Sequence, residues 1–406
     1  MKNLSRLAFY TVIIRAITLI LRLSLIIILA KFYTTDFVGI YGLIAGLVGI
    51  AVQLLPFGFI HYSTLEILEK NSISTNKILA NHFFFILIMG CFFAPIFYAS
   101  YGYMNISFNL FFYIVFVLIF EILALELSRI LIALKNPIGC YIVALIHSSL
   151  WIFGIIISLV KGVLVSMEEL LILWGSSSFL ASIIGFYFIK QDIFDKIFNL
   201  NLISIQWIKK GIFFSYPLLI ASLSHAINQY IGRFFLNNNV PVSDIGIFTI
   251  YFQISALILI AVEVLQSVYL PTYVEKYSSN KKNTFFELIM FFLICFIMLS
   301  IVFIEKYLFT FMNPELLNNL ETMHMLLLAI SALSFASVLR NRLYVKRLQY
   351  KIMYSYLIAM IISLVGNLLL VPKYGIYGSA STMFISAIAL AGFKPFGQVF
   401  AQFIIV

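Results

Sequence analysis

The sequence predicts an all-α integral membrane protein with about twelve transmembrane helices in two six-helix halves. The 406 residues are 63% hydrophobic and only 10% charged, whereas a soluble domain is about 45–50% apolar and about 25% charged. The apolar residues form long runs, and a helix needs about 20 such residues to cross a bilayer. This composition excludes a water-soluble enzyme, and three cysteines are too few for a disulfide scaffold.

The apolar runs give the expected helices in chain order. The first half holds runs at 8–30, 38–61, 78–99, 109–134, 139–160 and 168–189. The first run reads as a retained signal-anchor helix, because two arginines interrupt it and it lacks a small-residue cleavage site. The second half holds runs at 211–236, 244–270, 285–305, 321–340, 350–371 and 375–393. Lys394-Pro395 interrupts the last run, so residues 394–406 either complete that helix or lie along the membrane.

The distribution of basic residues supports this count and predicts the orientation. Five basic residues lie within or at the membrane: Arg15, Arg22, Arg129, Arg233 and Lys394. Of the other 21 Lys and Arg residues, 17 fall in alternate loops, the set that includes the N-terminus. A missed helix would have scrambled this alternation. By the positive-inside rule, both termini are expected in the cytoplasm.

The spans divide the chain into three parts. We expect an N-terminal half at 1–189, a cytoplasmic amphipathic linker at 190–210 and a C-terminal half at 211–406. The segments VGIY at 38–41 and IGIF at 245–248 each open a long apolar helix, 207 residues apart. Six helices per half give both halves the same orientation. Such parallel repeats are a transporter architecture, which predicts a central cavity between the halves.

Motifs of enzyme chemistry are absent from the sequence. There is no P-loop, no H-E-x-x-H and no G-x-S-x-G, and the five histidines are far apart. We therefore expect no catalytic residue, no metal and no cofactor, and the net charge of +10 reflects topology rather than nucleic-acid binding.

Ionisable residues inside the expected helices indicate function, because a charge at the bilayer centre costs about 2.5–3.5 kcal/mol. One face of the first helix carries Thr11, Arg15, Thr18 and Arg22. One face of the seventh helix carries His225, Asn228, Gln229 and Arg233. Two opposed polar stripes, one per half, would line a cationic cavity for an anionic substrate. For Arg233, near a helix end, snorkelling to the interface is the alternative.

The interiors of the expected helices 109–134 and 244–270 contain three carboxylates. Glu126 and Arg129 are three residues apart and could pair, which leaves Arg129 either a structural partner or a fourth cation for substrate. Glu121 has no partner on its own helix, and Glu263 has Gln266 three residues on. Glu121 and Glu263 are therefore candidates for an ion-coupling site, with structural pairing as the alternative.

Three segments resemble a known family. TTDFVGIY at 34–41 resembles the start of helix 2 in the polysaccharide flippases, and YPLL at 216–219, running on to Asn228 and Arg233, resembles their helix 7. VPKYGIYGSA at 371–380 resembles the entry to their last helix. With twelve spans, the chain is similar to the O-antigen flippases (Wzx type). These belong to the superfamily that includes the multidrug and toxic compound extrusion transporters. The interrupted end at Lys394-Pro395 departs from the family pattern.

The resemblance implies a flippase of the bacterial inner membrane that serves lipopolysaccharide biosynthesis. It would move an undecaprenyl-pyrophosphate-linked oligosaccharide to the periplasmic leaflet by alternating access, with H⁺ or Na⁺ as coupling ion. Its partners would be membrane lipids and the polysaccharide polymerase machinery. Arg15, Arg22, Arg129, Arg233, His225, Asn228 and Gln229 would bind substrate.

Four alternatives remain open on the sequence. An ion-coupled multidrug exporter of the same superfamily would be expected to centre on acidic residues. A membrane glycan polymerase would need a large external loop, and the external loops here are short. A lipid-linked peptidoglycan precursor flippase is a close variant that usually has more helices. A membrane scaffold would leave the polar stripes without a purpose.

Overall fold

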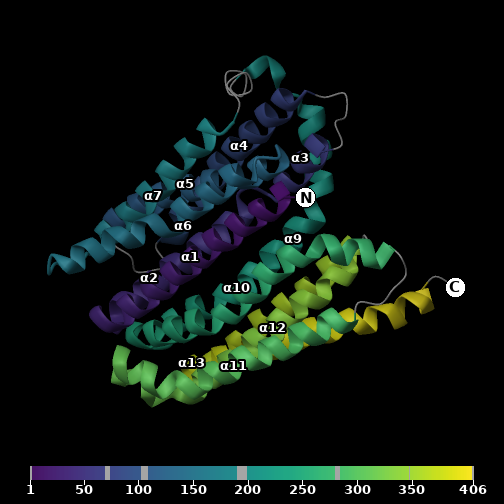
Figure 1. The fold of residues 1–406 in the computed structure, drawn as a ribbon. Coiled ribbons are helices and arrows are strands. Elements are labelled where there is room, and N and C mark those ends of the chain that lie inside the picture. The colour runs from purple at the N-terminus through teal and green to yellow at the C-terminus, as the bar shows by residue number, and fades with distance from the viewer. Residues whose placement is uncertain are drawn as a thin grey trace. The chain divides into compact units, whose positions relative to one another are not determined.

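The computed structural model describes residues 2–68, 74–101, 108–189, 199–278, 284–346 and 348–404. These residues form helices joined by short connections, without strands (Figure 1). The helices of the first part of the chain are α1 Lys2–Phe32, α2 Thr35–Leu54, α3 Phe59–Leu68, α4 Thr75–Tyr101, α5 Phe108–Ala133, α6 Pro137–Val160 and α7 Met167–Tyr187. The later elements are η2 Leu200–Leu202, α9 Ile205–Asn237, α10 Val242–Ser278, α11 Thr284–Met312, η3 Pro314–Asn319, α12 Leu320–Val345 and α13 Gln349–Ile404.

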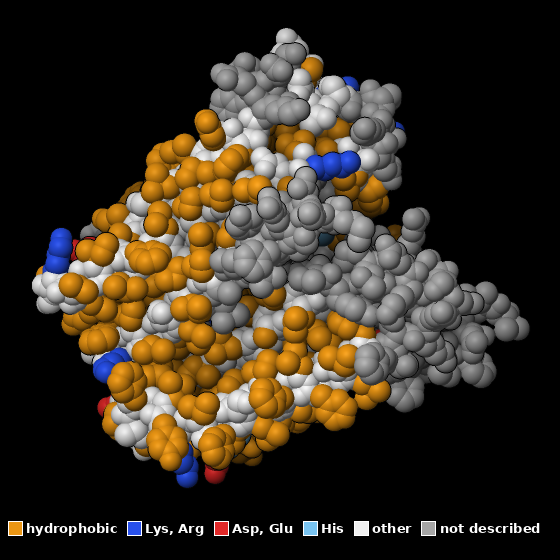
Figure 2. Space-filling view, in the orientation of Figure 1, with side chains coloured by type: hydrophobic (Ala, Val, Ile, Leu, Met, Phe, Trp, Pro, Cys, Tyr) orange, Lys and Arg blue, Asp and Glu red, His pale blue; other side chains and the backbone are white. Residues whose placement is uncertain are grey.

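Ten helices in the described ranges are long and apolar enough to cross a membrane. One of these candidate spans, Gln349–Gly392, covers two helices, because Gly375 has non-helical φ and ψ angles of 53° and −130°. The 31-residue α1 precedes them all. Hydrophobic side chains cover most of the described surface in view, as lipid-facing helices require (Figure 2). The all-α class with about twelve spans is confirmed.

The expected single helix at 38–61 is wrong, because the structure breaks it into α2 and α3. Pro56 cannot donate a backbone hydrogen bond. The next two residues, Phe57 and Gly58, have φ angles of 56° and 63°, which end a right-handed helix. A Cβ on Gly58 would contact the backbone of Leu219, so the turn also lets α9 approach closely.

Two compact units divide the chain, and the division passes through three helices. Unit 1 holds Met1–Leu25 and Leu47–Leu219, and unit 2 holds Ile26–Gly46 and Ile220–Val406. Residues 190–198 of the expected linker lie outside the described residues, while 199–210 include η2 and the first residues of α9.

Each unit has its own packed helices. In unit 1, α5 packs against α6 and α7 around Leu127, Ile130 and Val143. The start of α9 packs on α3 and α4 through a cluster that includes Phe59, Phe85 and Trp207. In unit 2, α12 packs against α10, α11 and α13.

The repeated glycine motif has a packing role inside unit 2. Gly39 of α2 and Gly246 of α10 face each other, since a Cβ on either would lie within 3.2 Å of the other residue's backbone nitrogen. Gly42 faces Thr249 one turn further on. Small residues let helix backbones approach in this way, so the two motifs mark one close helix crossing.

Gly246→Ala is expected to lower the stability of unit 2 by about 1–3 kcal/mol, the usual cost of overpacking. The added Cβ would collide with the backbone carbonyl of Thr35, which cannot rotate away. Thermal unfolding of the purified protein in detergent measures the effect. Gly90→Ala is the matched control, because a Cβ there meets open space. Equal unfolding temperatures for the two variants would show that the crossing is not tight.

Candidate functional site

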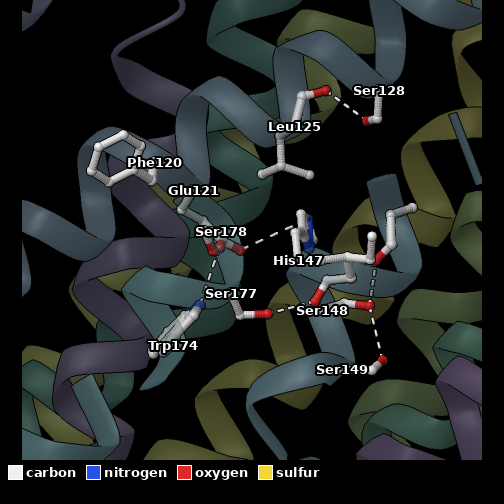
Figure 3. A network of polar contacts seen from close by, with 12 residues as sticks. Phe120, Glu121, Leu125, Ser128, His147, Ser148, Ser149, Trp174, Ser177 and Ser178 are labelled. Carbon is white, nitrogen blue, oxygen red and sulfur yellow. Dashed lines mark hydrogen bonds and ion pairs between the residues drawn. The ribbon is translucent and has the colours of Figure 1, made fainter. Parts of the chain in front are cut away.

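A buried carboxylate in unit 1, Glu121 of α5, lies at the centre of a polar network (Figure 3). Its Oε2 accepts hydrogen bonds from Trp174 Nε1 at 3.1 Å and from Ser178 Oγ at 2.6 Å, both on α7. Its Oε1 lies 3.9 Å from Nε2 of His147 on α6. One oxygen is therefore held by two neutral donors, whereas the other faces an imidazole.

Arg22 of α1 contributes positive charge near this network. Its side chain is exposed, and its charge acts on His147. The sequence left open whether Glu121 couples an ion or is a structural partner of another residue. The structure places His147 beside Glu121, within the electrostatic reach of Arg22. The side chain of Arg15 lies outside the described residues.

A second carboxylate of α5, Glu126, lies beside an arginine and a histidine. Its Oε1 accepts a hydrogen bond from Arg129 Nη1 at 2.8 Å, which confirms the predicted pairing. Its Oε2 lies 3.1 Å from Nε2 of His82 on α4. The two carboxylates of α5 therefore differ in kind. A full cation compensates Glu126, whereas neutral donors and a histidine surround Glu121.

The polar stripe of α9 separates into pairs inside unit 2. Gln229 Nε2 lies 3.1 Å from His225 Nε2, one turn away. The amide oxygen of Asn228 accepts a hydrogen bond from Ser386 Oγ of α13 at 2.7 Å. His225 also packs edge-on against the ring of Tyr356. These side chains hold α9 to α13 in this conformation.

Arg233 is buried in unit 2 with a relative exposure of 2%. Its guanidinium carbon lies 4.6 Å from the ring centre of Phe252 and 5.3 Å from that of Tyr230. Gly46 of α2 leaves room for it, since a Cβ there would lie 3.7 Å from Nη1. Within the described ranges no carboxylate forms an ion pair with Arg233, and its Nε has no hydrogen-bond partner. The side chain therefore does not snorkel.

The third candidate carboxylate, Glu263 of α10, is exposed. Gln266, which the sequence placed three residues on, instead donates a hydrogen bond to Ser337 Oγ of α12 at 2.9 Å. The candidates Glu121 and Glu263 therefore lie in different settings, one in a buried network and one at a surface. No group of three metal-binding side chains occurs within the part of the chain that the structure describes.

Sequence reasoning missed the partners that come from other helices. Trp174, Ser178 and His147 around Glu121, and His82 beside Glu126, lie 26 or more residues in sequence from the carboxylate that each contacts. One signal was present. Histidine and tryptophan inside apolar helices need a polar partner, and the buried carboxylates are such partners.

Comparisons with known proteins show the fold. No protein-family model and no curated protein matches the chain. Among solved structures, the chain is similar to the lipid II flippase MurJ in an inward closed conformation, with a TM-score of 0.72 and 14% identity over 96% of this chain and 87% of that one. It is also similar to an inward-facing multidrug resistance MATE family transporter of the MOP superfamily, with a TM-score of 0.69 and 13% identity over 94% and 97%. A MATE structure in the bent conformation is also similar, with a TM-score of 0.56 and 16% identity over 97% of this chain and 94% of that one. The chain therefore has the fold of these multi-pass membrane transporters.

Proposed function

We propose that this protein is a flippase rather than an enzyme. It translocates an undecaprenyl-pyrophosphate-linked oligosaccharide repeat unit, such as that of O antigen, from the cytoplasmic to the periplasmic leaflet of a bacterial inner membrane. The observation on which this rests is Arg233, a buried guanidinium with no carboxylate partner in the described residues. A buried unpaired charge costs several kcal/mol. Such residues are rare inside membranes, and they mark substrate or ion pathways.

The chemistry of arginine favours a phosphate group as the ligand. The planar guanidinium fork binds two phosphate oxygens at once, and it stacks on aromatic faces as Arg233 does on Phe252 and Tyr230. Arg22, exposed on α1, supplies a second cation in unit 1. The polar side chains of α9, His225, Asn228 and Gln229, are proposed to contact the sugar and the pyrophosphate. Arg15 and Arg129 complete the proposed cationic set.

Transport is proposed to be coupled to protons through Glu121. Its Oε1 faces His147 across 3.9 Å, whereas Oε2 is occupied by two hydrogen-bond donors. A metal cation of the sodium type would require several oxygen ligands, but Trp174 and Ser178 present N–H and O–H groups to the carboxylate. At 3.9 Å Glu121 Oε1 and His147 Nε2 share no hydrogen bond, and we propose that Oε1 binds the transported proton beside the imidazole. Glu263, exposed on α10, is the weaker candidate.

A second candidate function is export of small cations by the same fold. The observation that favours it is the likeness to two MATE structures together with the buried carboxylate Glu121, which a drug cation could approach. In the described residues Glu121 is engaged by Trp174 and Ser178, whereas Arg233 has no anionic partner. Because two hydrogen bonds satisfy Glu121 whereas Arg233 Nε has no acceptor, we favour an anionic substrate.

The leaflet in which the glycan accumulates distinguishes these functions. In a strain that lacks this gene, the completed lipid-linked unit is expected to accumulate on the cytoplasmic side, with loss of surface glycan. Accumulation on the periplasmic side would indicate a later step such as polymerisation. Unchanged glycan with altered drug sensitivity would favour the exporter.

Arg22→Ala is expected to abolish glycan export while the protein still inserts, because the exposed cation on α1 is lost without a packing defect. Arg22→Lys is expected to restore export only in part, since an ammonium cannot bind phosphate in a bidentate way. Surface glycan and membrane-fraction protein levels measure both effects. Normal export by Arg22→Ala would remove this residue from the mechanism.

A further inference from the structure

A chain of four side chains crosses the interior of unit 1 and ends at Arg129. Ser63 Oγ of α3 lies 2.9 Å from His82 Nδ1 of α4. His82 Nε2 lies 3.1 Å from Glu126 Oε2 of α5, and Glu126 Oε1 accepts from Arg129 Nη1 at 2.8 Å. Ser63, His82 and Glu126 are 0% exposed, whereas the Arg129 side chain is 38% exposed. Three buried groups thus connect to one cation at the surface.

The contacts of His82 differ on the two sides of its ring. Glu126 Oε2 lies 3.1 Å from His82 Nε2 without the alignment of a hydrogen bond. On the other side of the ring, His82 Nδ1 and the Ser63 hydroxyl share a hydrogen bond. The charges of Glu126 and Arg129 cancel. The interior therefore holds a paired carboxylate in a defined orientation.

Stability alone does not explain this chain. A half-exposed arginine needs no buried counter-ion, because its long stem lets the charge reach water or headgroups. A buried ion pair is weak evidence for stability, since apolar residues of similar size often replace it without loss. Its neighbours Leu127, Ile130 and Leu131 show that an apolar interior is available here. The effect that remains is to hold the guanidinium of Arg129 in one direction.

The guanidinium of Arg129 has donors left for a ligand. Within the described residues its hydrogen bond to Glu126 uses one Nη1 proton, and arginine has five N–H donors in a fixed fork. With Nη1 bonded to Glu126, the N–H groups on the other side of the planar guanidinium can donate to a ligand. Two parallel N–H donors match two oxygens of a phosphate group. The charge of Arg129 also acts on His61, which is exposed on α3, so a second nitrogen-bearing side chain lies nearby.

We propose that Glu126, His82 and Ser63 are positioning residues that hold Arg129 for a phosphate group of a lipid-linked ligand. The site lies on unit 1, at the end of the bundle where the α3–α4 and α5–α6 connections are predicted to be cytoplasmic. This inference rests on the proposed function, because it takes a polyprenyl pyrophosphate as the ligand. A phospholipid headgroup offers the same chemistry and is separated from it by the experiment.

Binding of farnesyl pyrophosphate to the full-length protein in phosphatidylcholine nanodiscs tests this proposal. Arg129→Ala, Glu126→Gln and His82→Leu are each expected to weaken binding about tenfold, as expected for a lost hydrogen bond to a charged group. His82→Gln is expected to recover most of the affinity, since its amide N–H can donate to Glu126. Lys161→Gln, at an exposed helix end, is the control and should bind like the wild type.

The variants separate failure of the inference from failure of the proposed function. Wild-type binding that Glu126→Gln and His82→Leu leave unchanged would overturn the positioning role, while the flippase proposal would stand. No binding by the wild type would overturn both. Nanodiscs containing phosphatidylglycerol give the second arm. If that lipid competes equally and only its binding depends on Arg129, the ligand is bulk lipid and the proposal fails. His82→Gln keeps the test valid if Glu126→Gln does not fold.

Discussion

Arg233→Met is expected to abolish glycan translocation and at the same time to raise the unfolding temperature. The guanidinium is buried at 2% exposure without a carboxylate partner in the described residues, so folding bears its desolvation cost. Replacement of buried charged groups by apolar ones is often neutral or stabilising by about 1–4 kcal/mol. In the proposed complex, Arg233 and the substrate phosphate form a buried charge pair. Loss of one partner of such a pair costs about 2–5 kcal/mol, which reduces substrate affinity about 30-fold or more.

Two measurements on the same sample check this prediction. Thermal unfolding gives the stability, and a leaflet-exchange assay in proteoliposomes gives the activity. Arg233→Lys should keep the charge but lose the stacking on Phe252 and Tyr230, so its activity should be intermediate. Lys373→Met, at an exposed position, is the matched control and should change neither quantity. An Arg233→Met variant that unfolds earlier and transports normally would make Arg233 a structural residue.

Glu121→Gln is expected to uncouple transport from the proton gradient. The glutamine oxygen can still accept from Trp174 and Ser178, so the local structure is preserved, but the side chain can no longer bind and release a proton. Gradient-driven transport should fall at least about tenfold, within the range of a general acid–base contribution. Exchange of substrate without a gradient should persist.

The measurement compares proteoliposomes with and without an imposed pH difference. Glu315→Gln, exposed in η3, is the matched carboxylate control and should retain full coupling. Glu263→Gln tests the other candidate of the sequence and should also retain coupling, because Glu263 is exposed. Retained gradient dependence in Glu121→Gln, with loss in Glu263→Gln, would reverse the assignment.

The features that could be predicted from sequence are those set by neighbours along the chain. The fold class follows from long apolar runs, since a segment in lipid must form all its backbone hydrogen bonds internally, as a helix does. The Glu126–Arg129 pair follows from a spacing of three on one helix, and the structure has that hydrogen bond. The repeated glycines at 39 and 246 were visible as a motif, although their mutual packing was not.

The features that could not be predicted depend on contacts between distant helices. Trp174 and Ser178 meet Glu121 only because α7 packs on α5. His82 meets Glu126 only because the fold brings α4 and α5 together at this point. The break between α2 and α3 was missed because the apolar run continues through it, and hydrophobicity alone does not mark a turn. The burial of Arg233 depends on Phe252 from the next helix, α10.

The most direct test of the account is translocation by the purified protein in proteoliposomes. The substrate is a pyrophosphate-linked polyprenyl glycan, with a cationic dye as the competing cargo. The account predicts that wild-type protein moves the glycan lipid between leaflets, that Arg233→Met does not, and that neither moves the dye. Dye transport by the wild type, with the glycan lipid left in place, would contradict the anionic-substrate mechanism and establish a cation exporter.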